Sequence, residues 1–416
     1  MEGCQLVREQ GLMHPADKSY KAKNSLEHWR ELPRISHPSV ITIPPPHTPL
    51  DRPPGNAALW AIACYGLTQY TPHHTHYDAF EEVLQLQPLT VGRNDLPEFL
   101  RTFDHKHIYQ SNFSGQIELP DHVDFPRLAR GRIRAQFWSV YVACNGSESE
   151  SSPRDYEYIH DTLQQIDLVH RLASLYPNNL TLVPSSSALR HTFDTSPSLI
   201  ASLLGVEGLH QIGCSASTLR LYHSLGARYT TLTHVCHNQY ADSASPAHHH
   251  HNGLSPAGRH MVLEMNRLGM AVDLAHASAK TMHDALDTSR ASVIFSHSSV
   301  YALCPNPRNV PNDVLLRLRE NNGIIMITFF PAYTRCDDPE AATLSDVADH
   351  IYKYPDLIAE LLRRGISIED MAAVTGGNIL RVLGEIERVG RRYGETGGCA
   401  LGGRYAFYFD AGGWSP

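Results

Sequence analysis

Residues 269–299, GMAVDLAHASAKTMHDALDTSRASVIFSHSS, decide the fold, because a helical stretch separates two short apolar runs there. The runs GMAVDLAHAS and ASVIFSHSS have the length and composition of buried strands. The stretch between them, SAKTMHDALDTS, is expected to form a helix. A buried strand, a helix and a second buried strand make a unit with parallel strands. The sequence therefore predicts an α/β fold.

Two runs upstream repeat the pattern: LIASLLGVEGLH at 199–210 and ARYTTLTHVC at 227–236. Each of the four runs carries, at or near its end, a side chain that can bind a metal or move a proton. The C-terminal ends of barrel strands converge on one pocket, so we expect these side chains to meet. A Glu and three His there would make a metal-hydrolase site. The four residues are Glu207, His234, His276 and His297.

The apolar runs predict a TIM-like (β/α) barrel. About seven strands are expected, near residues 89, 136, 182, 205, 230, 273 and 294, and the run GIIMITFF near residue 325 is the candidate eighth. Residues 1–77 are rich in Pro and polar residues and are expected to be a loosely packed leader. The barrel is assigned to residues 78–387, and residues 388–416 form a Gly-rich tail.

Composition excludes several classes of protein. The 416 residues carry a net charge of −8 with no basic stripe, which argues against a nucleic-acid partner. The longest early apolar run, near residues 57–67, is too short for a transmembrane segment. The N-terminus lacks the apolar core of a signal peptide, so we expect a cytoplasmic protein whose eight cysteines are reduced.

Each candidate residue has a plain alternative to its role in a site. Glu207 lies between glycines, as a solvated turn or a helix cap could, but a carboxylate there can also bridge two cations. His276 and His297 end successive strands and fit a pair of neutral zinc ligands. His234 could be a ligand or a donor that stabilises an oxyanion. Arg308 could clamp a substrate carboxylate or form a salt bridge in a surface loop.

Several motifs resemble the membrane (renal) dipeptidase family, peptidase family M19 of the amidohydrolase superfamily. They occur in order over about residues 80–387: QFWSVYV, IDLVHRL, GVEGLH, TLTHVC, GLSPAGRHMVLEMNRLGMAVDLAHAS, VIFSHSSVYALCPNPRNVPNDVL and KYPDLIAELLRRG. The resemblance implies a binuclear zinc hydrolase on a TIM-like barrel that cleaves dipeptides. A homodimer is implied as well.

The resemblance also assigns roles. Glu207 would bridge the two Zn²⁺ ions, and His276 and His297 would complete one of the two positions. His234 would contact the substrate and stabilise the tetrahedral intermediate, and Arg308 would bind the substrate's C-terminal carboxylate. Fungal relatives without signal peptides trim glutathione-derived adducts during the synthesis of sulfur-containing toxins, which suggests Cys-Gly-type conjugates as substrates.

One departure from the family concerns the first metal position. The family's first-strand motif is D-G-H-N-D-L-P, whose His and second Asp bind zinc, whereas this chain has V-G-R-N-D-L-P. Asp95 is present, but Arg93 stands where the His should be. A guanidinium cannot ligate zinc and brings a positive charge toward it. We therefore expect this position, left with Asp95 and Glu207, to be weak or empty, so that the chain holds one Zn²⁺ rather than two.

A second departure is a gap after Ile351, which runs almost directly into Tyr352-Lys353-Tyr354. The family has a further barrel strand there, ending in Asp-Phe-Asp-Gly, so we expect one barrel strand to be lacking. The two departures support an alternative function, a catalytically impaired barrel that only binds zinc or a peptide. Another amidohydrolase, acting on a cyclic amide or ester, is disfavoured because the ends of the predicted barrel strands carry neither the lysine nor the His-x-His pattern of such enzymes.

Four cysteines conflict with the cytoplasmic prediction. They fall where secreted members of the family form two disulfides, so a secretory route stays open. They are Cys144, Cys236, Cys304 and Cys336.

Overall fold

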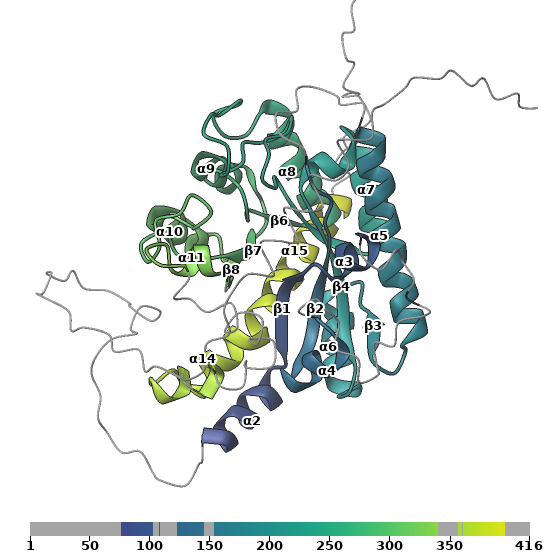
Figure 1. The fold of residues 1–416 in the computed structure, drawn as a ribbon, viewed down its shortest axis with the longest axis vertical. Helices are drawn as coiled ribbons and strands as arrows, with labels where there is room; N and C mark the ends of the chain where they lie inside the picture. The colour runs from purple at the N-terminus through teal and green to yellow at the C-terminus, as the bar shows by residue number, and fades with distance from the viewer. Residues whose placement is uncertain are drawn as a thin grey trace, which may run out of the picture. The chain divides into compact units, whose positions relative to one another are not determined.

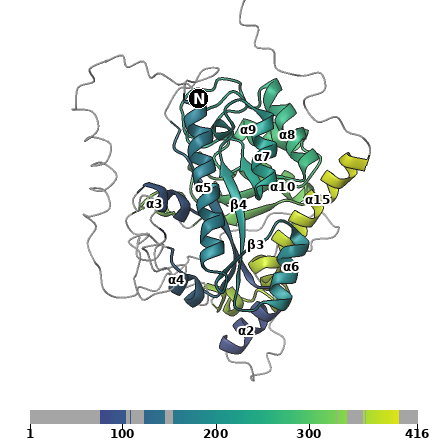
Figure 2. The same ribbon diagram turned by 90° about the vertical axis from the view of Figure 1, so that its right-hand side faces the viewer.

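Parallel strands and surrounding helices alternate along the chain in the computed structural model (Figures 1 and 2). The structure describes residues 76–102, 108, 123–144, 154–328, 330–339, 357–359 and 361–395. The predicted leader, the gap after Ile351 and the tail beyond residue 395 lie outside these ranges, apart from the first two residues of the first helix. This arrangement confirms the predicted α/β barrel class.

The described part of the chain has eight parallel strands, in all the regions where the sequence predicted them. Seven follow one another across the sheet in the order β1-β2-β4-β5-β6-β7-β8. Their bounds are β1 (Leu89–Asn94), β2 (Ile133–Val140), β4 (Ile200–Glu207), β5 (Ala227–Thr231), β6 (Ala271–Asp273), β7 (Ile294–Ser298) and β8 (Ile324–Ile327). The eighth, β3 (Leu180–Leu182), lies off this path and pairs only with β4, at Ile200, Ala201 and Ser202.

The seven-stranded path is nearly closed. Within the described ranges β1 and β8 are not paired, yet β1 approaches both β7 and β8 closely. A Cβ on Gly92 of β1 would lie 2.4 Å from the carbonyl oxygen of Ser296 and 2.7 Å from Sδ of Met326. The hydroxyl of Tyr229 in β5 also donates to the carbonyl of Gly92, at 3.2 Å. Glycine at position 92 therefore allows the two ends of the sheet to approach each other.

Helices alternate with the strands along the chain, and α9 (Ala279–Thr288) is the helix that the sequence predicts at SAKTMHDALDTS. The longer ones are α2 (His76–Leu86), α5 (Asp155–Leu175), α6 (Ser186–Thr195), α7 (Ala216–Ser224), α8 (Pro256–Leu268), α9 (Ala279–Thr288), α10 (Asn312–Glu320) and α15 (Asn378–Glu395). The shorter ones are α3 (Leu96–Thr102), α4 (Phe125–Arg130), η2 (Leu209–Ile212), α11 (Pro331–Thr334), α14 (Ile368–Ala372) and η3 (Ala373–Gly377). Helix α15 continues eight residues past the barrel boundary predicted at residue 387.

Local sequence explains the bounds of helix α8. The hydroxyl of Ser255 accepts a hydrogen bond from the backbone N–H of Gly258, and Pro256 occupies the first turn, where its missing N–H costs nothing. The helix ends at Gly269, whose φ of 72° is left-handed and favours glycine. Helix α9 begins in the same way, with Ser278 as its cap.

The alternation of side chains along β4 determines on which face of the strand Glu207 lies. All eight residues of β4 are buried, as expected for a parallel strand covered on both faces. Ala201 and Leu203 pack in one apolar cluster with α15, and Leu204 and Val206 pack in another. Because side chains alternate along a strand, Glu207 shares the face of Ala201 and Leu203.

The structure joins the four cysteines into two disulfides, Cys144–Cys236 and Cys304–Cys336. Two disulfides are the number that the family resemblance implied. Among the described helices, none is long and apolar enough to cross a membrane.

Candidate active site

The structure brings together the predicted site residues from five strands. Glu207 is the last residue of β4, and His297 lies within β7. His234 and His276 follow the ends of β5 and β6 by three residues each, and Arg93 lies in β1. All of them surround the carboxylate of Glu207, which is 1% exposed.

One oxygen of Glu207 faces the histidines. Its Oε1 lies 3.0 Å from Nε2 of His276 and 3.2 Å from Nε2 of His297. The two Nε2 atoms are 2.9 Å apart. These separations are close to the roughly 3.3 Å edge of a tetrahedron with bonds of about 2.0 Å, the usual geometry of zinc. The three atoms therefore fit a single metal ion.

The backbone and a serine orient the two histidines. His276 has a φ of 69°, a left-handed conformation that is uncommon outside glycine. Its carbonyl accepts a hydrogen bond from the N–H of Ala244 at 2.8 Å, which holds this conformation. The hydroxyl of Ser296 lies 2.8 Å from Nδ1 of His297, so Nε2 is left to face Glu207. Such a partner on the second ring nitrogen is usual for histidines that bind metals.

The other oxygen of Glu207 faces Arg93. Its Oε2 accepts hydrogen bonds from Nε of Arg93 at 2.8 Å and from the hydroxyl of Ser139 at 2.9 Å. The same guanidinium reaches Asp95, with Nη2 2.8 Å from Oδ2. Arg93 thus lies between the two carboxylates that the first metal position would use. The donor set on this side does not fit a metal ion, because a fixed cation already neutralises it.

Charges and burial set the protonation states. Burial would raise the pKa of Glu207, but Arg93 and hydrogen bonds from His276 and His297 hold that pKa well below its usual range. Burial lowers the pKa of His234 to about 3 and that of His297 to about 4. Burial and the charge of Arg308 also lower the pKa of His276. At neutral pH the imidazoles are neutral and the carboxylate is ionised, as metal binding requires.

His234 lies beside the three converging atoms but farther from Glu207. Its Nε2 is 3.9 Å from Oε1 of Glu207, and its ring centroid is 4.3 Å from that of His276. The ring of Tyr141 packs against it at 4.6 Å. A neutral imidazole there can donate a hydrogen bond to an oxygen atom that enters the site.

Arg308 is buried next to His297, with 4% of its surface exposed. One of its nitrogens, Nη2, donates to the carbonyl of His297 at 3.3 Å, and the guanidinium packs over the ring of Tyr333. Among the described residues, its Nε and Nη1 have no hydrogen-bond partner. Burial is incompatible with the surface salt bridge that the sequence left open, and two free donors suit a carboxylate ligand.

Sequence reasoning missed three residues of the site. Ser139 and Ser296 contact Glu207 and His297, and Asp273 accepts the backbone N–H groups of Ala275 and Ser296 at 3.0 Å each. Asp273 thereby links the ends of β6 and β7. A signal was present for two of them, because Ser296 directly precedes His297 and Asp273 lies three residues before His276.

The membrane dipeptidase model, peptidase family M19, matches residues 77–352 and 351–396. These two segments meet at the position where the sequence lacks the expected strand. The chain is 50% identical to Dipeptidase aclJ of Aspergillus oryzae over 352 residues, covering 77% of this chain and 83% of that protein. It is 43% identical to Dipeptidase tcpJ of Claviceps purpurea over 330 residues, covering 72% and 77%.

Solved structures resemble the fold. The probable dipeptidase PvdM from Pseudomonas aeruginosa matches with a TM-score of 0.64 at 19% identity, covering 76% of this chain and 99% of that one. A metallo peptidase from Rhodobacter sphaeroides, liganded with a phosphinate mimic of the dipeptide L-Ala-D-Ala, matches with a TM-score of 0.61 at 19% identity. It covers 72% of this chain and 99% of that one. At these identities the likeness concerns the fold.

Proposed function

The chain belongs to the membrane dipeptidase family, peptidase family M19, and on this premise we propose that it hydrolyses dipeptides with one bound Zn²⁺. The observation that supports this proposal is the convergence of Oε1 of Glu207 with Nε2 of His276 and of His297. These three residues would hold the ion. When bound there, Zn²⁺ supplies the positive charge that activates water for attack on a peptide carbonyl.

The chain's own residues would orient the dipeptide. His234 would donate a hydrogen bond to the oxygen of the scissile carbonyl, where negative charge develops during attack. Nε or Nη1 of Arg308, both without a partner among the described residues, would donate to the C-terminal carboxylate, which explains why an arginine is buried without a full set of partners. A requirement for a free carboxylate on the residue after the scissile bond would restrict the enzyme to the last peptide bond of a substrate, which in a dipeptide is its only one.

The proposed stoichiometry of one Zn²⁺ per chain rests on Arg93. Its guanidinium contacts both Asp95 and Glu207 at 2.8 Å. Although burial acts against it, these two carboxylates raise the pKa of Arg93, so it stays charged. A second Zn²⁺ between the same carboxylates would have to displace this cation.

Cysteinylglycine-type conjugates are the substrate class that we propose, in a cytoplasmic setting. The two relatives with the highest identities reported above are fungal proteins named dipeptidases. The test is hydrolysis of Cys-Gly and S-alkyl-Cys-Gly by the purified full-length chain, compared with Cys-Gly amide, a tripeptide, a lactone and a cyclic amide. We expect turnover of the free dipeptides alone. Turnover of the lactone or cyclic amide without the dipeptides would assign a different amidohydrolase activity.

Metal analysis of the same preparation tests the stoichiometry. We expect about one Zn²⁺ per chain in the wild type and about two in Arg93→His, which restores a ligand. Arg93→Gln is the matched control, because it removes the charge without supplying an imidazole, and it should stay near one. Two Zn²⁺ ions in the wild type, measured with the Cys144–Cys236 disulfide intact, would contradict the proposed role of Arg93.

The alternative is an impaired barrel that binds zinc or a peptide without turnover. The contacts of Arg93 and the break in the family match at 351–352 favour it. One bound Zn²⁺ with no hydrolysis of any dipeptide would establish this alternative. If Arg93→His then hydrolysed Cys-Gly, the first metal position would be the main defect. If it stayed inactive, the cause would lie in the gap after Ile351.

A further inference from the structure

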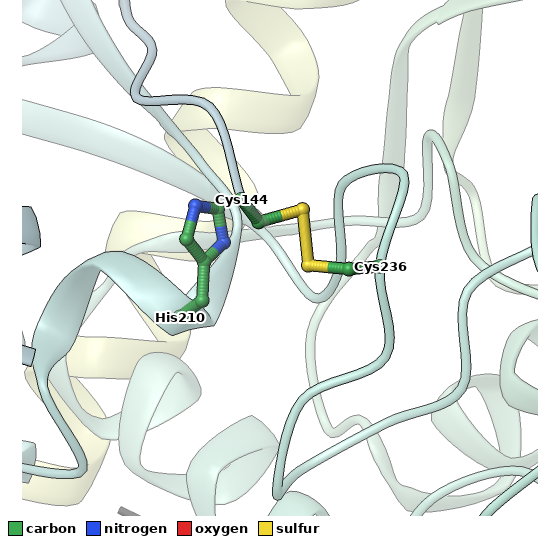
Figure 3. A group of neighbouring side chains, drawn as sticks. All are labelled: Cys144, His210 and Cys236. Atoms are coloured by element: carbon green, nitrogen blue, oxygen red, sulfur yellow. A yellow bond between two sulfur atoms is a disulfide. The ribbon is translucent and has the colours of Figure 1, made fainter. Parts of the chain in front are cut away.

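A second group of metal-ligating side chains lies outside the Glu207 site. It consists of Cys144, which follows β2, His210 in η2, and Cys236, which follows β5. One ligand atom from each residue lies within 4.8 Å of the other two, and all three residues are buried. Figure 3 shows the imidazole of His210 beside the disulfide between the two cysteines. We refer to these three residues as the Cys2His cluster.

His210 directs an unused nitrogen into this cluster. Its Nε2 lies 2.9 Å from the carbonyl of Val142, to which it must donate because a carbonyl only accepts. Its Nδ1 is then the bare acceptor, and it is buried with no hydrogen-bond partner among the described residues. In Figure 3 the Nδ1 edge of the ring is turned toward the cysteines. Burying a lone pair without a partner costs free energy. The Nδ1 atom therefore suits a hydrogen-bond donor or a metal ion as its partner.

We propose that reduction of the Cys144–Cys236 bond converts the Cys2His cluster into a binding site for Zn²⁺ or a similar thiophilic metal ion. A dithiol reductant supplies two electrons and two protons: the S–S bond breaks, two thiols form, and the reductant becomes a disulfide. Binding of Zn²⁺ then releases both thiol protons, since the thiolate is the ligand. Two thiolates and one imidazole leave the fourth tetrahedral position for water.

The second disulfide, Cys304–Cys336, has no histidine beside it that could complete a metal site among the described residues. The sulfurs of Cys304 and Cys336 both lie near the carbonyl of Ala332. Among the described residues, neither cysteine belongs to a group of three metal-ligating side chains. The two pairs therefore offer a matched comparison within one chain, because only one pair has a histidine beside it.

Either state of the cluster would fix the same two loops. Cys144 lies three residues after Tyr141, and Cys236 lies two residues after His234. The rings of Tyr141 and His234 pack against each other at the Glu207 site. A disulfide in an oxidising compartment, or a bound metal ion in a reducing one, would join the β2 and β5 loops. The cluster would thus keep His234 in place in both environments.

Cobalt titration of the full-length chain, reduced under anaerobic conditions, tests the proposal. Thiolate ligands give Co²⁺ a near-ultraviolet charge-transfer band, which the oxygen and nitrogen ligands of the Glu207 site cannot produce. We expect this band in the wild type and in the double variant Cys304→Ser/Cys336→Ser, and its loss in Cys144→Ser/Cys236→Ser. In His210→Gln, which keeps both cysteines, the affinity for Co²⁺ should fall roughly tenfold or more. A band of full strength in Cys144→Ser/Cys236→Ser, or none in the wild type, would overturn the proposal.

Alkylation of the reduced wild type gives a readout that does not depend on the folding of any variant. Added Zn²⁺ should protect Cys144 and Cys236 from a thiol-alkylating reagent, while Cys304 and Cys336 react at an unchanged rate. Mass spectrometry of the digested protein identifies which cysteines were protected. Equal protection of both pairs, or of neither, would contradict a site built on His210.

Discussion

The two oxygens of Glu207 face two different halves of the same site. Oε1 meets neutral imidazoles, from His276 and His297, whereas Oε2 meets the charged guanidinium of Arg93. Only the guanidinium neutralises the carboxylate, whereas the neutral imidazoles leave the negative charge and ring lone pairs for an added cation. One substitution in a strand can thus replace an exchangeable metal ion with a permanent charge.

We call the side of the site with His276 and His297 the histidine half and the side with Arg93 the arginine half. Removing a side chain should reduce activity far more on the histidine half than on the arginine half. His276→Ala removes one of the three converging atoms, so bound zinc should be lost and kcat/KM for a dipeptide should fall about a thousandfold. Asp95→Ala, which removes a partner of Arg93, should cost less than about tenfold. Metal analysis and dipeptide hydrolysis of both variants measure the effects. Similar losses in the two variants would show that both halves hold metal.

Arg308→Ala tests the proposed carboxylate clamp beside the histidine half. Because a charge-assisted hydrogen bond would be lost, kcat/KM for a dipeptide should fall about a hundredfold. Lysine can restore the charge but not the forked geometry, so Arg308→Lys should recover only part of the activity. The zinc content of each variant serves as the control. If zinc were lost together with activity, Arg308 would act on the structure rather than on the carboxylate.

The serines on the two halves give a smaller, matched effect. Ser296→Ala removes the partner of Nδ1 of His297 and should weaken zinc affinity about tenfold. Ser139→Ala removes a donor to Oε2 of Glu207, on the half occupied by Arg93, and should leave zinc affinity nearly unchanged. Competition with a chelator measures both affinities. A larger loss in Ser139→Ala would reverse the assignment of the two halves.

Acid should destabilise the metal-free protein through the histidine half. The pKa of His234 is about 3 in the folded chain and near 6.5 when unfolded, so the unfolded state binds the proton more tightly. The contribution of neutral His234 to the free energy of unfolding is complete above pH 6.5 and is lost as the pH falls toward 3. Between pH 7.5 and 5.5 we expect a loss of about 1 kcal/mol in the free energy of unfolding from this residue.

Denaturant titrations of the wild type and His234→Gln isolate this contribution, because the variant should lack it. In both proteins Asp273 has the opposite effect on the pH dependence of the free energy of unfolding. Burial raises its pKa to about 6, so its ionised form weakens the fold as the pH rises. An identical pH dependence in the two proteins would show that His234 is not buried as a neutral group.

Strands and ligand residues could be predicted because they depend on local patterns. Short apolar runs indicated all the described strands, and parallel strands place their carboxyl ends at one face of the sheet. This reasoning selected Glu207, His276 and His297, whose atoms the structure brings within 3.2 Å. It did not place β3 beside the path of the barrel, because pairing with β4 alone depends on neighbours distant in sequence.

The sequence by itself determined the α/β barrel, its strand order along the chain, the resemblance to M19 dipeptidases and the substitution at Arg93. Only the tertiary structure decided what Arg93 does, because its bond to Glu207 joins residues 114 positions apart. The orientation of the buried Arg308 and the placement of His210 beside Cys144 and Cys236 were decided in the same way. Periodicity fixes which face of a strand a residue occupies, whereas side-chain partners depend on how distant segments pack.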